Sequence, residues 1–577
     1  MSFISVAISL LATSVFAVTT ENKHATTSPP GCRSIPGDCS WPTPKQWSLL
    51  NQTVGGNLIA TVPIAAPCHK TLFDKPSSTF NQEECDALRS EWFYPTTHLS
   101  SSSSPMAYTF SNSSCNPFLG PETPCTIGYH VAYAINATCA EDFQAAIRFA
   151  KYHNIRLVIR NTGHDYLGKS TGAHALGIWT HSLKSISLIQ KYQDENYKGL
   201  AIKVGAGVES IEAYEFADSH GLIVVGGNCP TVGFAGGYIQ GGGHGPLSSR
   251  YGLAADQVLE YEVVTADGKL VTATNKVNND LFWALRGGGG STYGIVVSVT
   301  VKAFPDTAFS TSYLEVPNNG EDVEALYSVI GTFLQTLPRL VDAGAIAIFV
   351  VSASGFSLTP AIAPGMQPVE LDSHFHPVFD RLHSLGLKYN YSSSAHPTFL
   401  NMFNTMSTVS NVSDQNLGGR LIPRSLVENN NTDALVDAIR YISMQEGALF
   451  VGNAISVKGG VSSPNEISAN PHFRDALVSA TVGTYIDYMS KDTTLARMRS
   501  ITDDLLPKLE ALTPGGGAYL NEGDVHQPDF QSTFYGDHYD RLLQIKQKYD
   551  TQDIFYAQTA VGSERWVQEL NGRLCLV

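Results

Sequence analysis

The stretches RNTGHDYLG (residues 160–168) and GGNCPTVGFAGGYIQGGGHG (residues 226–245) decide the fold of this chain of 577 residues. The first follows a short β-rich run. Gly163 and Gly168 give its backbone the latitude to direct successive N–H groups at a phosphate pair. In the second stretch nine of the twenty residues are glycine, which is incompatible with a helix or a regular strand core. Such density indicates close approach of the backbone to a planar or phosphate-bearing ligand.

Other interpretations of these stretches fit the sequence less well. A flexible linker would not carry Cys, Pro, Val, Phe and Tyr between β-rich runs. A nicotinamide-type fingerprint, G-x-G-x-x-G opening a helix with an acidic residue about 20 positions on, does not fit the flanking pattern. Taken alone, His164 is typical of a hydrogen-bonded loop histidine, and Cys229 of a free reactive thiol. The two could also form a cysteine-hydrolase dyad, but nothing nearby resembles such a family's surroundings.

Regular elements alternate around the glycine-rich stretches. Apolar residues at helical spacing predict a helix over 140–154, and IRLVIR, 155–160, predicts a strand. The remaining patterns predict strand, helix and strand over 201–227, a hairpin over 258–274 turning at Asp267-Gly268, a short helix over 278–290 and a strand over 294–304. From about 306 to 515 helices and strands alternate without recognisable chemistry, which predicts a second domain.

Charge and length exclude several classes of protein. The 37 basic and 52 acidic residues give a net charge of −15 without a long run of either sign, so no nucleic-acid or anionic-membrane partner is expected. Single cores stop growing at roughly 250–300 residues, so at least two domains are expected. Residues 1–17 are a short apolar stretch that ends in small residues, which predicts a cleaved secretory signal rather than a buried helix. No later segment approaches the roughly 20 apolar residues of a membrane helix.

Cysteines and glycosylation motifs agree with export. Seven of the nine cysteines lie before residue 140, which predicts an irregular extension, 18–125, that is stapled by disulfides such as Cys32–Cys39. An odd count leaves one cysteine over, and the isolated Cys229 is the natural candidate. The N-x-[ST] sequons begin at Asn51, Asn112, Asn136, Asn390, Asn411 and Asn430.

The motifs taken together resemble a known family. RNTGHDYLG is followed, 65 residues after its histidine, by the cysteine of GGNCPTVG. The match continues through GGGHGPLSSRYGLAADQVLEYEVVTADG, LFWALRGGGGSTYGIV and FYGDHYDRLLQIKQKYDTQDIFYAQ. These motifs resemble the berberine bridge enzyme-like branch of the vanillyl-alcohol oxidase superfamily, and the chain looks most like its secreted fungal members. The resemblance is close over about 126–305 and 515–560 and loose between them.

The resemblance implies an α+β fold of two domains. A PCMH-type FAD-binding domain, 126–305, is joined by the C-terminal segment 516–577 around a substrate domain, 306–515, with an antiparallel sheet. It also implies covalent FAD, with His164 on the 8α carbon and Cys229 on carbon 6 of the isoalloxazine. The other cofactor-binding residues that it implies are Arg160, Asn161, Thr162, Gly163, Asp165, Gly168, Gly227, Val232, Gly236, Gly237, Gln240, Gly242, Gly243, Gly294, Val296, Tyr556 and Gln558. No metal site is expected.

The motif YLNEGD, residues 519–524, is similar to the family's Y-x-N-x-x-D strand near the flavin. On a strand, Tyr519 and Asn521 project to one face and Glu522 to the other. We therefore expect Tyr519 to act as a base, provided that the site lowers its pKa from about 10. Asn521 would orient the substrate. Glu522 would be the base only in a shifted register, and Tyr519 could instead be a packed core aromatic.

One departure from the family pattern bears on oxygen chemistry. Many relatives have C-P-T-V-G-x-G-G-H, whereas here Phe234 and Ala235 occupy the gap and Tyr238 replaces the histidine. Val232 still fits the oxygen-reactive pattern, but the extra residue alters the oxygen pocket. The choice between an oxidase and a dehydrogenase that uses another acceptor therefore stays open.

The predicted function is a secreted, N-glycosylated and monomeric FAD-dependent oxidase. It would transfer a hydride from an alcohol, a carbohydrate or a secondary metabolite to the flavin, and dioxygen would then give hydrogen peroxide. Besides the dehydrogenase, two alternatives stay open. One is a secreted carbohydrate-binding or allergen-like protein with a structural flavin. The other is an enzyme of oxidative cyclisation.

Overall fold

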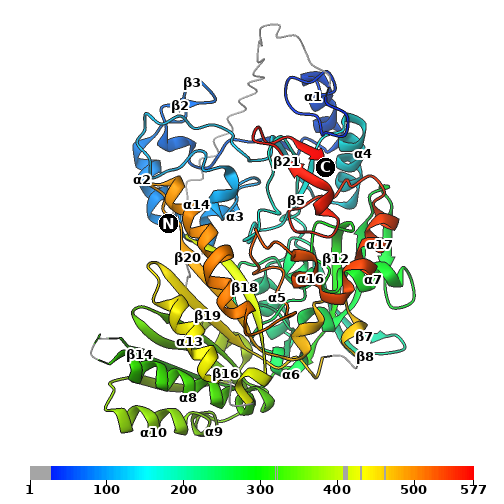
Figure 1. Ribbon diagram of the computed structural model, residues 1–577. Helices are drawn as coiled ribbons and strands as arrows, with labels where there is room; N and C mark the ends of the chain where they lie inside the picture. The colour runs from blue at the N-terminus through cyan, green and yellow to red at the C-terminus, as the bar shows by residue number, and fades with distance from the viewer. Residues whose placement is uncertain (1–27, 319, 321, 407–412, 429–431, 461–462) are drawn as a thin grey trace, which may run out of the picture.

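The computed structural model describes residues 28–318, 320, 322–406, 413–428, 432–460 and 463–577 (Figure 1). The predicted signal, 1–17, and the sequon residues Asn411 and Asn430 lie outside these ranges. Three larger sheets and the helices around them make up the molecule, so the predicted α+β class is confirmed. Within the described residues, no helix has the length and apolar character needed to cross a membrane.

The first sheet carries the loop that contains His164. Its strands run in the order β1 (Leu58–Ala60), β4 (Tyr133–Asn136), β6 (Leu176–Trp179) and β5 (Leu157–Arg160). β4, β6 and β5 are parallel, while β1 is antiparallel to β4. The predicted helix is α4 (Ala140–His153), which buries Phe143 and Ile147. The sheet therefore ends, after β5, in the RNTGHDYLG turn.

The second sheet is antiparallel and supports the glycine-rich stretch. Its strand order is β11 (Leu270–Ala273), β10 (Val258–Val264), β12 (Ile295–Lys302), β8 (Lys198–Gly205) and β7 (Ile186–Gln193). β10 and β11 form the predicted hairpin, and Gly268 has the positive φ, 80°, that its turn needs. The helices predicted within 201–227 and 278–290 are α5 (Ser210–Asp218) and α7 (Asn279–Leu285).

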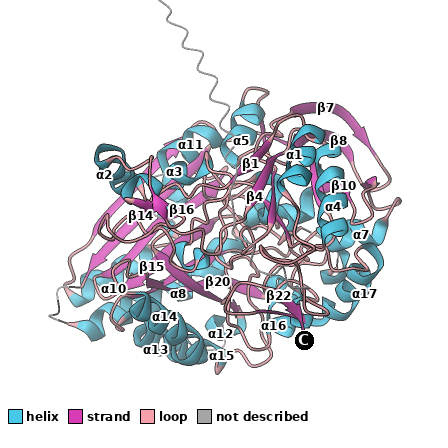
Figure 2. Cartoon of the chain, turned by 90° about the horizontal axis from the view of Figure 1, so that it is seen from above, coloured by secondary structure: helices cyan, strands magenta, loops and turns pink. Residues whose placement is uncertain are grey.

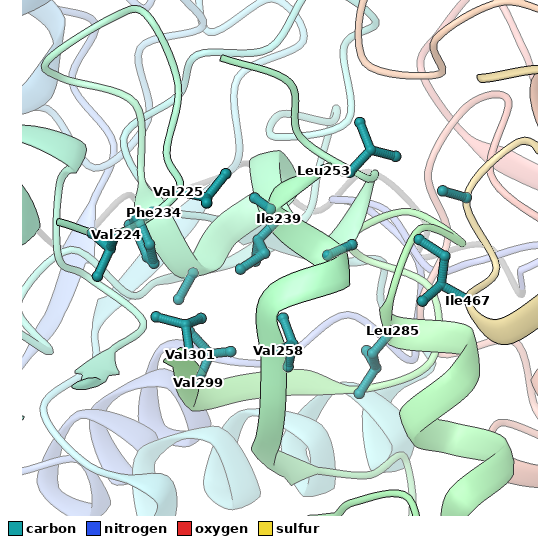
Figure 3. Packing of buried hydrophobic residues seen from close by; sticks show 14 of the residues in the cluster. Val224, Val225, Phe234, Ile239, Leu253, Val258, Leu285, Val299, Val301 and Ile467 are labelled. Carbon is teal, nitrogen blue, oxygen red and sulfur yellow. The ribbon is translucent and has the colours of Figure 1, made fainter. Parts of the chain in front are cut away.

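The core beneath the 226–245 stretch joins this stretch to β12 and α7. Phe234 and Ile239 are fully buried and belong to one apolar cluster with Val299 and Leu285 (Figure 3). The glycine-rich backbone is therefore anchored by its few large apolar side chains and is not a linker.

The third sheet is antiparallel throughout, as predicted for the substrate domain. Its order is β17 (Asn390–His396), β14 (Phe309–Pro317), β16 (Gly355–Pro364), β15 (Ile346–Ser352), β19 (Ala448–Ala454), β20 (Ala476–Tyr485) and β18 (Gln415–Pro423). α8 (Val323–Asp342) and α13 (Thr432–Ser443) pack their apolar faces on it. Figure 2 sets β14 and β16 on one side of the molecule and β7, β8 and β10 on the other.

Shorter elements connect and cover these sheets. The further helices are α1 (Pro44–Thr53), α2 (Gln82–Glu91), α3 (Pro95–Leu99), α6 (Ser248–Tyr251), α9 (Pro368–Ser373), α10 (His376–Leu385), α11 (Phe399–Met406), α12 (Ser425–Glu428), α14 (Lys491–Ser500), α15 (Leu506–Glu510), α16 (Phe530–Tyr535) and α17 (Tyr539–Tyr549). The further strands are β2 (Thr71–Leu72), β3 (Lys75–Pro76), β9 (Leu222–Ile223), β13 (Phe304–Pro305), β21 (Trp566–Gln568) and β22 (Leu574–Leu576). The predicted domain boundaries stay predictions.

One of the three disulfides joins the start of the described chain to its C-terminal end. Cys32 pairs with Cys575, 543 residues away, so the predicted Cys32–Cys39 bond is wrong. This pairing has no local signature, because it follows from the fold placing Cys32 and Arg33 beside β22. In Figure 1 the blue start of the described chain lies near the red C-terminal strands. Bonds Cys68–Cys85 and Cys115–Cys125 lie within the extension. Cys229 has a free thiol, as predicted from its isolation, but Cys139 has one too, so the expectation that Cys229 alone is left over is wrong.

Candidate active site

One cavity is lined by most of the residues that the sequence assigned to the cofactor. It encloses about 1570 Å³, counted with its solvent-open mouth. Its walls come from the loop after β5, the 226–245 stretch, the turn before β12 and the C-terminal residues 519–522. The predicted site residues on these walls are Asn161, Thr162, Gly163, His164, Asp165, Gly227, Cys229, Val232, Gly236, Gly237, Gln240, Gly294, Val296, Tyr519 and Asn521.

His164 and Cys229 meet on one wall of the cavity. The His164 Nε2 atom lies 4.0 Å from the Cys229 Sγ atom, although 65 residues separate the two in the chain. The Thr231 hydroxyl lies between them, 2.7 Å from Nε2 and 3.5 Å from Sγ. The two strongest sequence candidates therefore share one neighbour, and the sequence prediction did not include it.

The turn that holds Cys229 and Thr231 is fixed to the start of α5. The Ser210 amide donates to the Val232 carbonyl at 2.9 Å, and the Ile211 amide donates to the Pro230 carbonyl at 3.0 Å. These bonds use two N–H groups of the first helical turn, which have no partner within the helix. The turn is therefore held by a regular element rather than by the loop alone.

His164 is held in its neutral form. Burial, helped by the positive charge of Arg160 and by His98, lowers the pKa of His164 to about 3. An imidazole without charge keeps an unprotonated ring nitrogen, which is the form that can act as a nucleophile.

Arg160 does not line the cavity, although it was assigned to the cofactor. Its guanidinium is buried and donates to the carbonyls of Ser101, Ser104, His98 and Thr162. The residue therefore braces the turn from behind.

The turn after β5 requires glycine at position 163. The φ of Gly163 is +92°, and a Cβ here would lie 2.3 Å from the Arg160 guanidinium. The loop can adopt its shape only while both the positive φ and the close arginine are accommodated.

Five other predicted cofactor residues also lie off the cavity wall: Gly168, Gly242, Gly243, Tyr556 and Gln558. Gly168 packs against Phe110, and the Gln558 amide donates to the Val525 carbonyl at 3.2 Å. The assignment of these five residues to the cofactor rests on motif membership and stays a prediction.

Residues 519–522 form a turn, so the prediction that this segment is a strand is wrong. The Glu522 amide donates to the Tyr519 carbonyl at 3.0 Å, which reverses the chain. As a result Tyr519, Asn521 and Glu522 all line the cavity, and Glu522 does not point away. The alternation argument failed because it assumed an extended backbone that the turn does not provide.

Glu522 contacts a buried histidine. Its two carboxylate oxygens lie 3.2 and 3.3 Å from His244 Nε2, and Thr481 Oγ1 donates to Oε2 at 3.4 Å. The His244 side chain is 5 % exposed and that of Glu522 is 24 % exposed, so the carboxylate is the part of the pair that reaches the open cavity.

The Tyr519 hydroxyl is surrounded by hydrogen-bond donors. Asn521 Nδ2 donates to it at 2.8 Å and the Gly243 amide hydrogen-bonds to it as well. The second Asn521 Nδ2 hydrogen goes to the Gly237 carbonyl at 2.9 Å. Burial, together with the charge of Glu522, still raises the pKa of Tyr519, whereas a tyrosinate base requires a lowered pKa. The geometry therefore favours a neutral phenol that donates its own hydrogen into the cavity.

The cavity suits a polar cofactor. Asn161 Oδ1, Lys169 Nζ and Asn228 Oδ1 are buried without a hydrogen-bond partner in the described part of the chain. Burial lowers the pKa of Lys169 to about 8. Such groups call for a ligand with matching donors and acceptors, and the phosphates, ribitol and ring edges of FAD supply both.

Several lining residues were missing from the predicted site, namely Tyr166, Lys169, Asn228, Tyr238 and His244. Thr231, which reaches His164 directly, was missing as well, although it does not itself line the cavity. Each lies within or beside a quoted motif, so position in the motif was the signal that could have found it. Local contacts accommodate the residues that depart from the family pattern. Phe234 is buried in the core, and the Tyr238 hydroxyl donates to the His244 carbonyl at 3.2 Å.

Fold and cavity define a flavoenzyme, and the comparisons with known proteins agree. Residues 131–274 match the model of an FAD binding domain, and residues 518–562 match the model described as berberine and berberine like. The chain belongs to the berberine bridge enzyme-like branch of the vanillyl-alcohol oxidase-type flavoproteins. It is an FAD-linked oxidoreductase that acts on a small-molecule substrate.

Similar proteins cover nearly the whole chain. FAD-linked oxidoreductase sor8 of Hypocrea jecorina is 43 % identical over 551 residues, or 95 % of this chain and 93 % of that relative. VAO-type flavoprotein oxidase VAO615 of Thermothelomyces thermophilus is 41 % identical over 98 % of both chains. The crystal structure of VAO-type flavoprotein MtVAO615 from Myceliophthora thermophila C1 has a TM-score of 0.89 at 39 % identity, covering 95 % of this chain and 100 % of that one.

Proposed function

We propose that the chain is an oxidase that holds FAD through two covalent bonds, from His164 and from Cys229. The observation that carries this proposal is the 4.0 Å approach of His164 Nε2 to Cys229 Sγ on the wall of the cavity that also contains Tyr519 and Glu522. Two nucleophilic side chains this close together suit attachment to the same ring of the isoalloxazine. A tethered cofactor would also not be lost on dilution.

Retention of the cofactor in acid tests the two bonds. Protein that is precipitated in acid should stay yellow, and one flavin should link the peptides that contain His164 and Cys229 in a mass spectrum. A flavin on one peptide alone would contradict double attachment, while flavin that washes out entirely would contradict both bonds.

When bound, FAD supplies a two-electron acceptor for a hydride from the substrate carbon. Glu522 accepts the proton from the substrate hydroxyl, because its carboxylate reaches the cavity and His244 supports it at 3.2 Å. Tyr519, kept neutral by burial and by Glu522, donates a hydrogen bond to the substrate oxygen. Asn521 fixes the Tyr519 hydroxyl at 2.8 Å.

Dioxygen is the proposed electron acceptor and hydrogen peroxide the proposed product. Val232 of the oxygen-reactive pattern lines the cavity, and a relative with 41 % identity is named a flavoprotein oxidase. Aerobic peroxide release should be screened over cello-oligosaccharides, benzylic alcohols and polyketide-type allylic alcohols. Enzyme that is bleached by a substrate but does not regain its yellow colour in air would instead be a dehydrogenase.

Export, glycosylation and a monomeric state complete the proposal. The three disulfides and the exposed sequon residues Asn112 and Asn390 support export. When the full chain is expressed in a fungal host, the culture medium should contain a protein that lacks residues 1–17. This protein should lose mass on treatment with an N-glycosidase. Retention inside the cell would contradict the proposed route, and size-exclusion chromatography would test the monomer.

A further inference from the structure

Thr231 stands between the two residues that are proposed to carry the flavin. We propose that Thr231 is the positioning residue for covalent attachment, preparing His164 and Cys229 together as nucleophiles; this inference rests on the proposed double attachment. Its hydroxyl is the group within hydrogen-bond reach of both, at 2.7 Å from Nε2 and 3.5 Å from Sγ.

The directions of the two hydrogen bonds follow from the chemistry of the three groups. A neutral imidazole has one N–H and one bare nitrogen. When Nε2–H donates to Thr231 Oγ1, Nδ1 keeps its lone pair and becomes the attacking atom. The threonine hydrogen is then available to Cys229 Sγ, where it stabilises the thiolate, which is the reactive form of cysteine. One hydroxyl thus sets the tautomer of His164 and favours ionisation of Cys229.

Thr231 cannot readily leave this position. It is 8 % exposed, and its turn is fixed by the bonds of Ser210 and Ile211 at the start of α5. The hydroxyl is therefore already oriented before a flavin is attached, and its ordering costs little at the time of reaction.

Each attachment balances as a two-electron oxidation. His164 loses its ring proton and forms a C–N bond to the 8α carbon, which loses one hydrogen. Cys229 loses its thiol proton and forms a C–S bond to carbon 6, which also loses one hydrogen. For each bond the two electrons and two protons pass to one dioxygen molecule, which becomes hydrogen peroxide. Dioxygen is the acceptor already named in the proposed function.

The substitution T231V tests the hydroxyl, because valine keeps the shape of threonine and removes the hydrogen bonds. The full chain is produced under riboflavin limitation and is then given FAD in air. Formation of covalent flavin is followed by mass spectrometry of the two linked peptides and by acid-stable absorbance. We expect T231V to form the doubly linked product at least about tenfold more slowly than wild type, and T231S to recover most of the rate.

The controls separate the possible failures. Equal rates in wild type and T231V would overturn the role of Thr231, while wild type with no linked flavin would overturn the double attachment on which it rests. Slow attachment in both T231V and T231S would assign the effect to packing of the methyl group and also overturn the hydroxyl role. If T231V does not fold, T231A and T231S, each with its unfolding midpoint measured, replace that comparison.

Discussion

The two sides of the cavity have opposite requirements for protonation. The attachment wall, made of His164 and Cys229 with Thr231 hydrogen-bonded to both, is electrically neutral where its histidine lies, because burial lowers the pKa of His164 to about 3. The proton wall, made of His244, Tyr519 and Glu522, keeps a carboxylate at 24 % exposure beside a buried imidazole. A nucleophile gains from losing its proton permanently, whereas a proton acceptor must remain able to take one up. The difference lies in burial and in neighbours rather than in residue type, since both walls use a histidine.

A single stretch of chain contributes to both walls. Residues 226–245 give Cys229 to one wall and His244 to the other. The spacing between the walls therefore depends on the backbone of this stretch and on the core residues beneath it (Figure 3).

Among the variants that separate the roles of the two walls, E522Q should have the largest effect. The variant removes the proton acceptor and leaves the attachment wall intact, so flavin content should not change. We expect the rate of anaerobic flavin bleaching, with the best alcohol from the peroxide screen, to fall by about 10²–10⁴-fold. The exposed Glu446 offers a matched control, and E446Q should behave as wild type. A loss of less than about threefold in E522Q would remove Glu522 from the mechanism.

The next largest effect is expected behind the attachment wall. R160M leaves four buried carbonyls without their donor, and we expect it to lower the free energy of unfolding by about 3–5 kcal/mol. Urea unfolding measures this value. R148M, at an exposed position on α4, should change it by less than about 0.5 kcal/mol. Equal midpoints for the two variants would mean that Arg160 does not brace the turn.

A third prediction concerns pH and His98, next to the attachment wall. Burial, assisted by the charge of Arg160, lowers the pKa of His98 to about 4. The unfolded chain takes up this proton near pH 6.5 and the folded chain only near pH 4, so folding stability falls as the pH drops through this window.

The variant H98Q should reduce that fall by about 1–3 kcal/mol between pH 6.5 and 4, as measured by urea unfolding at several pH values. Exposed His220 provides the control H220Q, whose pH dependence should match that of wild type. An unchanged slope in H98Q would show that the buried histidine does not control acid stability.

The smallest expected effect concerns Thr481, which contacts Glu522 of the proton wall. Thr481 donates to Glu522 at 3.4 Å, a long hydrogen bond, so T481V should lower the bleaching rate by only about two- to fivefold. T481S should retain the wild-type rate. A loss as large as that of E522Q would mean that Thr481, rather than His244, holds the carboxylate.

Local features of the sequence predicted much of the fold. Periodicity located α4 and the β10–β11 hairpin, and glycine density located the cavity wall that contains Cys229. The prediction for Tyr519–Glu522 was wrong because a turn and a strand can share the same short polar pattern, and only the surrounding chain selects between them. Nor did the motif predict that Arg160 lies off the cavity wall, since a motif identifies a neighbourhood but not which way a side chain points.

The Cys32–Cys575 bond determines how the chain responds to cleavage by a protease. Since it joins positions 543 residues apart, almost the whole polypeptide is a closed covalent ring. One cut by a protease at an exposed loop would open this ring without releasing a fragment, and the two pieces would separate only after reduction. A nicked molecule would therefore keep both walls of its cavity tethered to each other.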